Sequence, residues 1–176
     1  FKYSEQIKEI KVIDRNFTNN LVFENKKSQS NLGYIIKNKI ILKKIYLKLK
    51  EMKNVTFMSN SNVCSIDYDN NHIFSKSNLS LIKSDLVIAA DGKNSKVRNI
   101  IKTPYYKKNY NQSALVVCFS HNNSHNNTAY EFFYKNGPLA ILPMKKESGN
   151  FCSSLVWSND TDILNQLMAI EENDLI

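Results

Sequence analysis

Glycine is scarce in this chain. Only four of its 176 residues are glycine, namely Gly33, Gly92, Gly137 and Gly149. The G-x-G-x-x-G and G-x-x-x-x-G-K-[ST] phosphate-binding loops each need glycines within about five positions of one another. The closest two glycines here, at 137 and 149, are 12 positions apart. Residues 1–176 therefore contain no glycine-rich phosphate-binding loop of either kind.

Arginine is scarcer still, although the chain is basic. The net charge is +8, from 24 basic and 16 acidic residues, but only Arg15 and Arg98 are arginine. The other 22 basic residues (24 minus 2) are lysines spread along the whole sequence. Nucleic-acid surfaces usually favour arginine and cluster their positive charge. The pattern predicts a solvated lysine surface and no nucleic-acid partner, with a basic module for anionic lipid or nucleic acid as the alternative.

Cysteine and histidine are few and form no metal-binding motif. Cys64, Cys118 and Cys152 lie far apart without a C-x-x-C pair, which favours a reduced intracellular protein with buried thiols. His121 and His125 stand in an Asn-rich stretch without a cysteine or carboxylate beside them, so we predict no metal site. No apolar run approaches the roughly 18 residues of a membrane-spanning helix.

The patterns that are present predict a mixed α/β (α+β) chain. Apolar residues recur every three to four positions over 39–53, which indicates an amphipathic helix. Residues 85–90 are almost continuously apolar, typical of a strand covered on both faces, and a helix over 93–101 follows them. Shorter apolar runs between polar breaks predict further strands at 10–13, 21–23, 32–36, 55–58, 62–68 and 72–75.

Past residue 105 the pattern becomes that of a sheet. Four strand-like runs, at 112–120, 128–135, 138–144 and 151–158, follow one another with short connections and no helix between them. Such a succession predicts an antiparallel sheet. The chain begins with Phe1 rather than Met and stops inside a run of helical periodicity, so we expect an internal fragment of a longer protein.

The motif that carries chemistry is DLVIAADGKNSKVR, residues 85–98. A buried strand would deliver Asp91 to the carboxyl end of a sheet, where ligands bind in open α/β folds. Gly92 would allow a sharp turn, and Ser95 would open a helix whose N-terminus suits a diphosphate. Arg98 would lie one turn further, within reach of a phosphate. The alternative is a simple helix cap by Asp91 or Ser95, with Arg98 on the surface.

This string resembles the Asp-Gly motif of the FAD-dependent aromatic hydroxylases related to p-hydroxybenzoate hydroxylase. Within that family, other segments resemble the ubiquinone-biosynthesis 2-polyprenylphenol hydroxylases and follow in the same order. They are LGYIIKN (32–38), Tyr110-x-Gln112-x-Ala114, Ala129-Tyr-Glu131-x-Phe133, GPLAILP (137–143) and SLVW (154–157). The resemblance covers about residues 30–158.

The resemblance implies a division into domains. Residues 1–29 would be a strand pair of a β-rich substrate domain, and residues 30–104 the middle of a Rossmann-like FAD-binding domain. Residues 105–176 would return to the antiparallel β-sheet substrate domain. The resemblance also implies cofactor-binding roles for Asp91, Gly92, Ser95 and Arg98 near FAD, while no catalytic residue is named. The strand on the substrate and flavin side would present Gly137, Pro138, Leu139, Ala140 and Pro143.

Members of this family use FAD, a reductant such as NAD(P)H and molecular oxygen to hydroxylate a phenol ring. The resemblance therefore implies a polyprenylated phenol as substrate and a cytoplasmic place, with peripheral contact to the inner face of the membrane or to a quinone-biosynthesis complex. Alternatives are a same-fold flavoprotein acting on another aromatic substrate, and a flavin reductase.

The sequence also departs from the family pattern. Relatives commonly carry Glu where Lys37 stands, and Arg or Gln where Leu42 and Lys43 stand. The family's G-x-G-x-x-G would lie before Phe1 and its Gly-Asp motif after Ile176. We therefore expect the isolated 176 residues to bind FAD weakly or not at all, and to have no turnover.

Overall fold

The computed structural model describes residues 2–14, 20–25, 30–69, 72–77 and 80–170. The chain divides into two compact units, and each is described by itself. One unit contains residues 1–48 and 109–176, and the other contains residues 49–108. The predicted domain boundaries, after residues 29 and 104, refer to whole domains of a longer protein and remain predictions.

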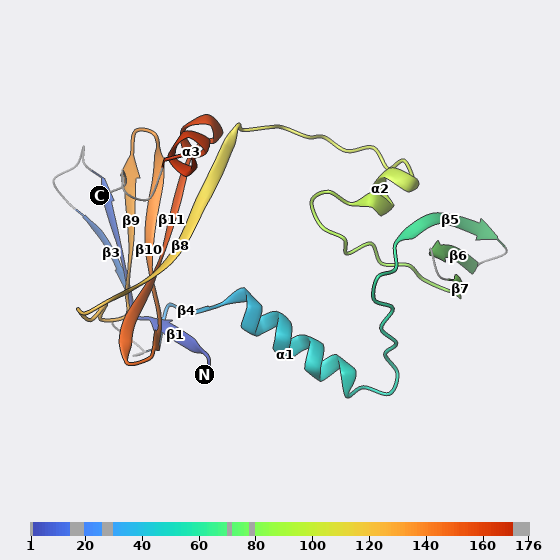
Figure 1. Ribbon diagram of the computed structural model, residues 1–176, viewed down its shortest axis with the longest axis horizontal. Helices are drawn as coiled ribbons and strands as arrows, with labels where there is room; N and C mark the ends of the chain where they lie inside the picture. Colours follow the sequence, from blue (N-terminus) through green and yellow to red (C-terminus); the bar gives the residue numbers. More distant parts are fainter. Residues whose placement is uncertain (1, 15–19, 26–29, 70–71, 78–79, 171–176) are drawn as a thin grey trace. The chain divides into compact units, whose positions relative to one another are not determined.

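A six-stranded sheet forms the body of the first unit (Figure 1). The order of its strands is β3-β2-β9-β10-β11-β8, and every neighbouring pair is antiparallel except β2 with β9. The antiparallel sheet predicted from the four runs after residue 105 is therefore confirmed. The strand pair predicted within residues 1–29 is also confirmed, because β2 pairs with β3. The strands are β2 (Glu9–Asp14), β3 (Leu21–Glu24), β8 (Gln112–His121), β9 (Thr128–Tyr134), β10 (Gly137–Glu147) and β11 (Asn150–Asp160).

Glycines decide where the central strands turn. Ser148 and Gly149 form the two-residue connection between β10 and β11, with φ of 49° and 87°. Two positive φ values are what a tight type I′ hairpin requires. Gly137 begins β10 with a φ of 129°, and a Cβ there would stand 2.0 Å from the carbonyl oxygen of Ser158 on β11. The backbones of β10 and β11 can approach this closely only because residue 137 has no side chain.

Smaller elements complete the first unit. β1 (Ser4–Ile7) pairs with β4 (Gly33–Ile36), and this ribbon contacts β10. The helix α1 (Asn38–Lys50) follows, which confirms the predicted amphipathic helix, although none of its residues is buried. A short helix, α3 (Thr161–Met168), contacts β8 and β11 and buries Leu164.

The second unit is built on a three-stranded antiparallel sheet in the order β5-β6-β7. β5 (Val63–Asp69) and β6 (His72–Ser77) confirm the strands predicted there, and the turn predicted at residues 70–71 lies outside the described residues. β7 (Leu81–Ser84) is the third strand, and α2 (Lys96–Ile100) contacts β5. α2 is shorter than the helix predicted over 93–101.

Two predicted strands are wrong. Residues 55–58 and 85–90 are not strands, and in the second run Leu86 and Ile88 are 71% and 78% exposed. A strand that is buried on both faces needs a paired strand on each side and covering elements above and below. No described strand of either unit pairs with residues 86–90. The apolar composition of 85–90 therefore indicates a strand, but the described residues supply nothing that would pair with it.

Candidate cofactor site

Asp91 caps the helix α2 through both of its carboxylate oxygens. Oδ1 accepts a hydrogen bond from Ser95 Oγ at 2.5 Å, and Oδ2 accepts from the backbone N–H groups of Lys96 at 2.7 Å and Val97 at 3.1 Å. These bonds, first that from Ser95 and then that from Val97, hold the pKa of the Asp91 carboxyl below its ordinary value. Asp91 is thus an ionised acceptor that organises this turn.

Ser95 completes the cap from the other side. Its Oγ accepts a hydrogen bond from the backbone N–H of Arg98 at 3.0 Å while it donates to Asp91. The first N–H groups of a helix have no partners within it, so these contacts satisfy the free donors of α2. Asp91 and Ser95, which the sequence analysis placed in the site, therefore cap the helix α2. Their contact with a cofactor remains a prediction.

Unlike Asp91 and Ser95, Gly92 and Arg98 do not cap α2 with their side chains. Gly92 has a φ of 81° and nothing within 4 Å of the position of a Cβ, so the backbone there is open to an approaching group. The guanidinium of Arg98 donates from Nη2 to the carbonyl oxygen of Lys93 at 2.8 Å and lies 4.2 Å from the centre of the Tyr105 ring. Its Nε is buried without a hydrogen-bond partner among the described residues.

A cavity of about 440 Å³ opens beside Arg98. Sequence reasoning missed most of its wall, although the run YYKK directly after Pro104 was a visible signal of aromatic and basic residues together. Asp91, Gly92 and Ser95 do not line this cavity. Its lining residues are Lys93, Asn94, Arg98, Asn99, Tyr105, Tyr106 and Lys107.

The strand β10 carries the other predicted site residues and lies in the interior of the six-stranded sheet, between β9 and β11. Leu139 stands opposite Phe132 on β9 and Trp157 on β11. Gly137 and Pro138 start the strand, Ala140 is half-buried, and Pro143 is fully buried. The predicted residues follow one another on this strand, so Gly137, Leu139 and Pro143 lie on one face of the sheet and Pro138 and Ala140 on the other.

A row of aromatic rings on β9 accompanies this strand, and sequence reasoning did not place it. Tyr130 and Phe132 stack with ring centres 6.2 Å apart, and Phe132 and Tyr134 stack at 6.1 Å. Residues two apart on a strand share one face of the sheet, so the period-two spacing of these aromatics was a usable signal. Glu131 points to the opposite face, where burial raises the pKa of its carboxyl.

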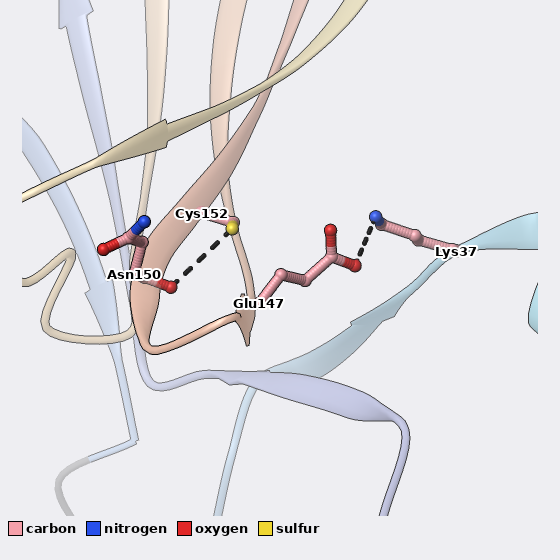
Figure 2. A network of polar contacts seen from close by, with 4 residues as sticks. All are labelled: Lys37, Glu147, Asn150 and Cys152. Carbon is pink, nitrogen blue, oxygen red and sulfur yellow. Dashed lines mark hydrogen bonds and ion pairs between the residues drawn. The ribbon is translucent and has the colours of Figure 1, made fainter.

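An ion pair ties the start of α1 to the β10–β11 hairpin. Lys37 Nζ contacts Glu147 Oε1 at 2.5 Å (Figure 2). This hydrogen bond is the main reason that the pKa of Lys37 lies above its ordinary value. Lys37 thus has an ion-pair partner within its own compact unit.

The two histidines of the Asn-rich loop hold backbone groups. His121 Nδ1 bonds the carbonyl oxygen of Asn123 at 2.7 Å, and His125 Nε2 bonds that of Met144 at 3.1 Å. Across the described part of the chain, no group of three His, Cys, Asp or Glu side chains could hold a metal ion. No described helix is long and apolar enough to cross a membrane.

The chain is similar in sequence to several known proteins, although no protein-family model matches it. The chain is 30% identical over 168 residues to the ubiquinone hydroxylase UbiL of Rhodospirillum rubrum. It is 32% identical over 179 residues to the mitochondrial ubiquinone biosynthesis monooxygenase COQ6 of Caenorhabditis elegans. These matches cover 95% and 98% of the chain. The chain is a partial match to the FAD-dependent hydroxylase family. It spans 38% and 39% of the length of these two relatives.

Solved structures resemble this chain in fold. PqsL, a probable FAD-dependent monooxygenase from Pseudomonas aeruginosa, matches with a TM-score of 0.75 at 16% identity, over 95% of the chain and 46% of PqsL. CmlS, a flavin-dependent halogenase, matches with a TM-score of 0.65 at 14% identity, over 94% of the chain and 31% of CmlS. At such low identity the likeness concerns the fold alone.

Proposed function

We propose that this chain is part of an FAD-dependent monooxygenase that hydroxylates a phenolic precursor in ubiquinone biosynthesis. The observation that carries the proposal is the match to UbiL and COQ6, which extends over nearly the whole chain at 30% and 32% identity. The motifs at 32–38, 85–98 and 137–143 all lie within the matched length.

The residues around Arg98 fit a dinucleotide cofactor. Lys93, Arg98 and Lys107 bring three cationic groups to one cavity of about 440 Å³, and Tyr105 and Tyr106 add aromatic rings. Cations suit phosphate groups, and ring faces suit a base or a second ring. The buried Nε of Arg98 has a free donor for such a ligand. Gly92 leaves its backbone open, while Asp91 and Ser95 hold the turn in place. Bound FAD would supply the oxidation–reduction chemistry with oxygen.

The face of β9 and β10 that carries the aromatic row fits the substrate. Tyr130, Phe132 and Tyr134 share this face with Leu139 and Trp157 by the register of the strands. Aromatic rings and apolar side chains suit a phenol with a prenyl tail, and they exclude water from a reacting ring.

Three finer features complete the proposal. The reductant is NAD(P)H, the second substrate is molecular oxygen, and the protein works in the cytoplasm at the inner face of the membrane or in a quinone-biosynthesis complex. The support for the membrane position is chemical, because a polyprenylated phenol dissolves in the bilayer and the chain carries a net charge of +8 that suits an anionic surface.

The test uses the purified protein that contains this chain, supplied with FAD, NAD(P)H and a short-chain 2-prenylphenol. We expect bound flavin, NAD(P)H oxidation that depends on the phenol, and a product heavier by one oxygen atom. The Arg98→Ala variant should bind FAD roughly 10-fold more weakly, in keeping with the loss of one charge-assisted contact. Lys53→Ala, in the same compact unit but outside the cavity, should bind FAD normally.

Two results would contradict the proposal. Purified protein that never retains flavin would exclude a flavin monooxygenase. Flavin-dependent oxidation of NAD(P)H that no prenylphenol stimulates, and that another aromatic compound does, would assign the protein to a same-fold enzyme with a different substrate.

A further inference from the structure

The chain turns directly after α2 in a defined way. The backbone N–H of Thr103 donates to the carbonyl oxygen of Arg98 at 3.2 Å, and that of Lys102 donates to the carbonyl oxygen of Asn99 at 3.3 Å. Lys102, between these bonds, has a left-handed φ of 52°. Two such bonds around a left-handed residue form the Schellman motif, which ends a helix. Pro104 follows at once, so the helix cannot resume.

This turn brings the ring of Tyr105 onto the side chain of Arg98. The guanidinium carbon lies 4.2 Å from the ring centre, well within the roughly 6 Å of a cation–π contact. Nη2 of the same group donates to the carbonyl oxygen of Lys93 at 2.8 Å. Nε is buried without a hydrogen-bond partner among the described residues, which agrees with a guanidinium held there by packing. Arg98 is thus fixed by Lys93, before the helix, and by Tyr105, after it.

A guanidinium that is already fixed binds a phosphate more tightly than a mobile one. Arginine has a long side chain, and ordering it when a ligand binds costs conformational entropy that reduces the affinity. Arg98 lines the cavity of about 440 Å³ together with the cations Lys93 and Lys107. The contact with Tyr105 orders the Arg98 side chain within the protein itself, so that less of this entropy is lost on binding.

We propose that Tyr105 is a positioning residue, whose ring holds the Arg98 guanidinium in the orientation that receives a phosphate of the dinucleotide. This role rests on the proposed function, because the dinucleotide is what brings phosphate to the cavity. The ring carries the role and the hydroxyl does not, since the face of any aromatic ring attracts a cation. Tyr106 lines the same cavity and is 88% exposed, whereas the cation–π contact of Arg98 is with Tyr105. The two neighbouring tyrosines therefore form a matched pair.

A double-mutant cycle on FAD binding tests this role. The purified protein that contains this chain is titrated with FAD, and the dissociation constant is taken from the change in flavin fluorescence. Tyr105→Leu should weaken binding by about 3- to 5-fold, the size of a cation–π contact at a site that is 55% exposed. Tyr105→Phe keeps the ring and should bind like the parent.

The cycle separates positioning from direct contact with the cofactor. In the Arg98→Ala background, Tyr105→Leu should cause no further loss, because the ring then has no guanidinium to hold. Tyr106→Leu should change the dissociation constant by the same factor whether Arg98 is present or not. A tyrosine that only supported the fold would lower the melting temperature without this coupling to Arg98.

A second measurement reads the Arg98 side chain without any ligand. In a ¹⁵N-labelled protein the Nε–H resonance that disappears in Arg98→Ala is the one from Arg98. We expect it to be shifted by the ring current of Tyr105 and to exchange slowly with water, because Nε is buried. Tyr105→Phe should keep both properties and Tyr105→Leu should lose both.

The outcomes distinguish this role from the proposed function. If the parent protein binds no FAD, the proposed function fails and the role of Tyr105 fails with it. If the parent binds FAD and Tyr105→Leu binds it equally well, the role of Tyr105 alone is overturned. It is also overturned if Tyr105→Leu weakens binding just as much without Arg98, or if Tyr105→Phe binds as weakly as Tyr105→Leu.

Discussion

Gly137 should be the least replaceable glycine of the chain. Its φ of 129° lies where L-residues are strained, and a Cβ would stand 2.0 Å from the carbonyl oxygen and 2.9 Å from the carbonyl carbon of Ser158. Both contacts are with backbone atoms of β11, which cannot rotate away as a side chain could. A Gly137→Ala variant must therefore push apart two strands in the middle of the sheet.

The size of the effect follows from two contributions. A non-glycine residue in a sparsely populated backbone conformation costs about 1–3 kcal/mol. Forcing a methyl group into a packed interior costs about another 1–3 kcal/mol. The expected loss is about 2–6 kcal/mol, against a total stability of about 5–15 kcal/mol for a domain. Gly137→Ala should therefore lose a large share of the stability of the first unit.

Two other glycines provide matched controls. Gly149 has a φ of 87° but nothing within 4 Å of a Cβ, so Gly149→Ala should cost only about 1–2 kcal/mol. Gly33 has neither a positive φ nor a close neighbour, so Gly33→Ala should stay within about 1 kcal/mol of the parent. Urea unfolding followed by the fluorescence of Trp157, the single tryptophan, reports on the sheet itself. Equal midpoints for Gly137→Ala and Gly149→Ala would refute the steric argument.

Two further predictions concern charged groups. The pKa of Asp91 is lowered by its cap hydrogen bonds, so its contribution to stability is present above its unfolded value, near 3.8, and is lost as pH falls through the folded value. Asp91→Ala should speed hydrogen exchange of the Lys96 and Val97 amides at neutral pH, as NMR can measure, and this effect should fade as pH falls through the folded pKa of Asp91. Equal protection in both proteins at neutral pH would show that the cap does not matter. The pKa of Lys37 is raised by Glu147, so its contribution is present at neutral pH and is lost as pH rises through the folded value, above 10.5. Because the side chains are 36% and 57% exposed, Lys37→Met should cost no more than about 1 kcal/mol in thermal unfolding at pH 7, and a larger loss would mean that Lys37 does more than pair with Glu147.

The sequence was a good guide where structure depends on local alternation. The runs at 112–120, 128–135, 138–144 and 151–158 are all strands of one sheet, because short connections between successive strands leave antiparallel pairing as the simplest arrangement. The helix beginning at Asn38 also follows from its period. One feature of the sheet could not be predicted from such patterns. The parallel pairing of β2 with β9 joins residues more than a hundred positions apart, and no local signal specifies it.

At the candidate site the sequence predicted the capped turn before α2 correctly, but it did not predict most of the residues that line the cavity. Asp91, Gly92, Ser95 and Arg98 do form one local structure, since their spacing is that of a capped turn before a helix. Only Arg98 among them lines the cavity, and Tyr105, Tyr106 and Lys107 complete it after the chain has passed through α2 and Pro104. Spacing predicts contacts within a turn or two, whereas a cavity wall depends on where the following loop returns.

The exposed run at 85–90 shows what an apolar pattern does and does not specify. Its composition indicates burial, because apolar side chains gain free energy wherever water is removed from them. It does not indicate what removes the water, and within the second unit the three strands of the β5-β6-β7 sheet pair only with one another. A strand forms only beside another strand, because its backbone N–H and C=O groups need hydrogen-bond partners on a neighbour. In a helix such as α1 these groups bond to one another within the helix. That difference explains why the predicted helix at 39–53 forms with no buried residue, while the more apolar run at 85–90 does not form a strand.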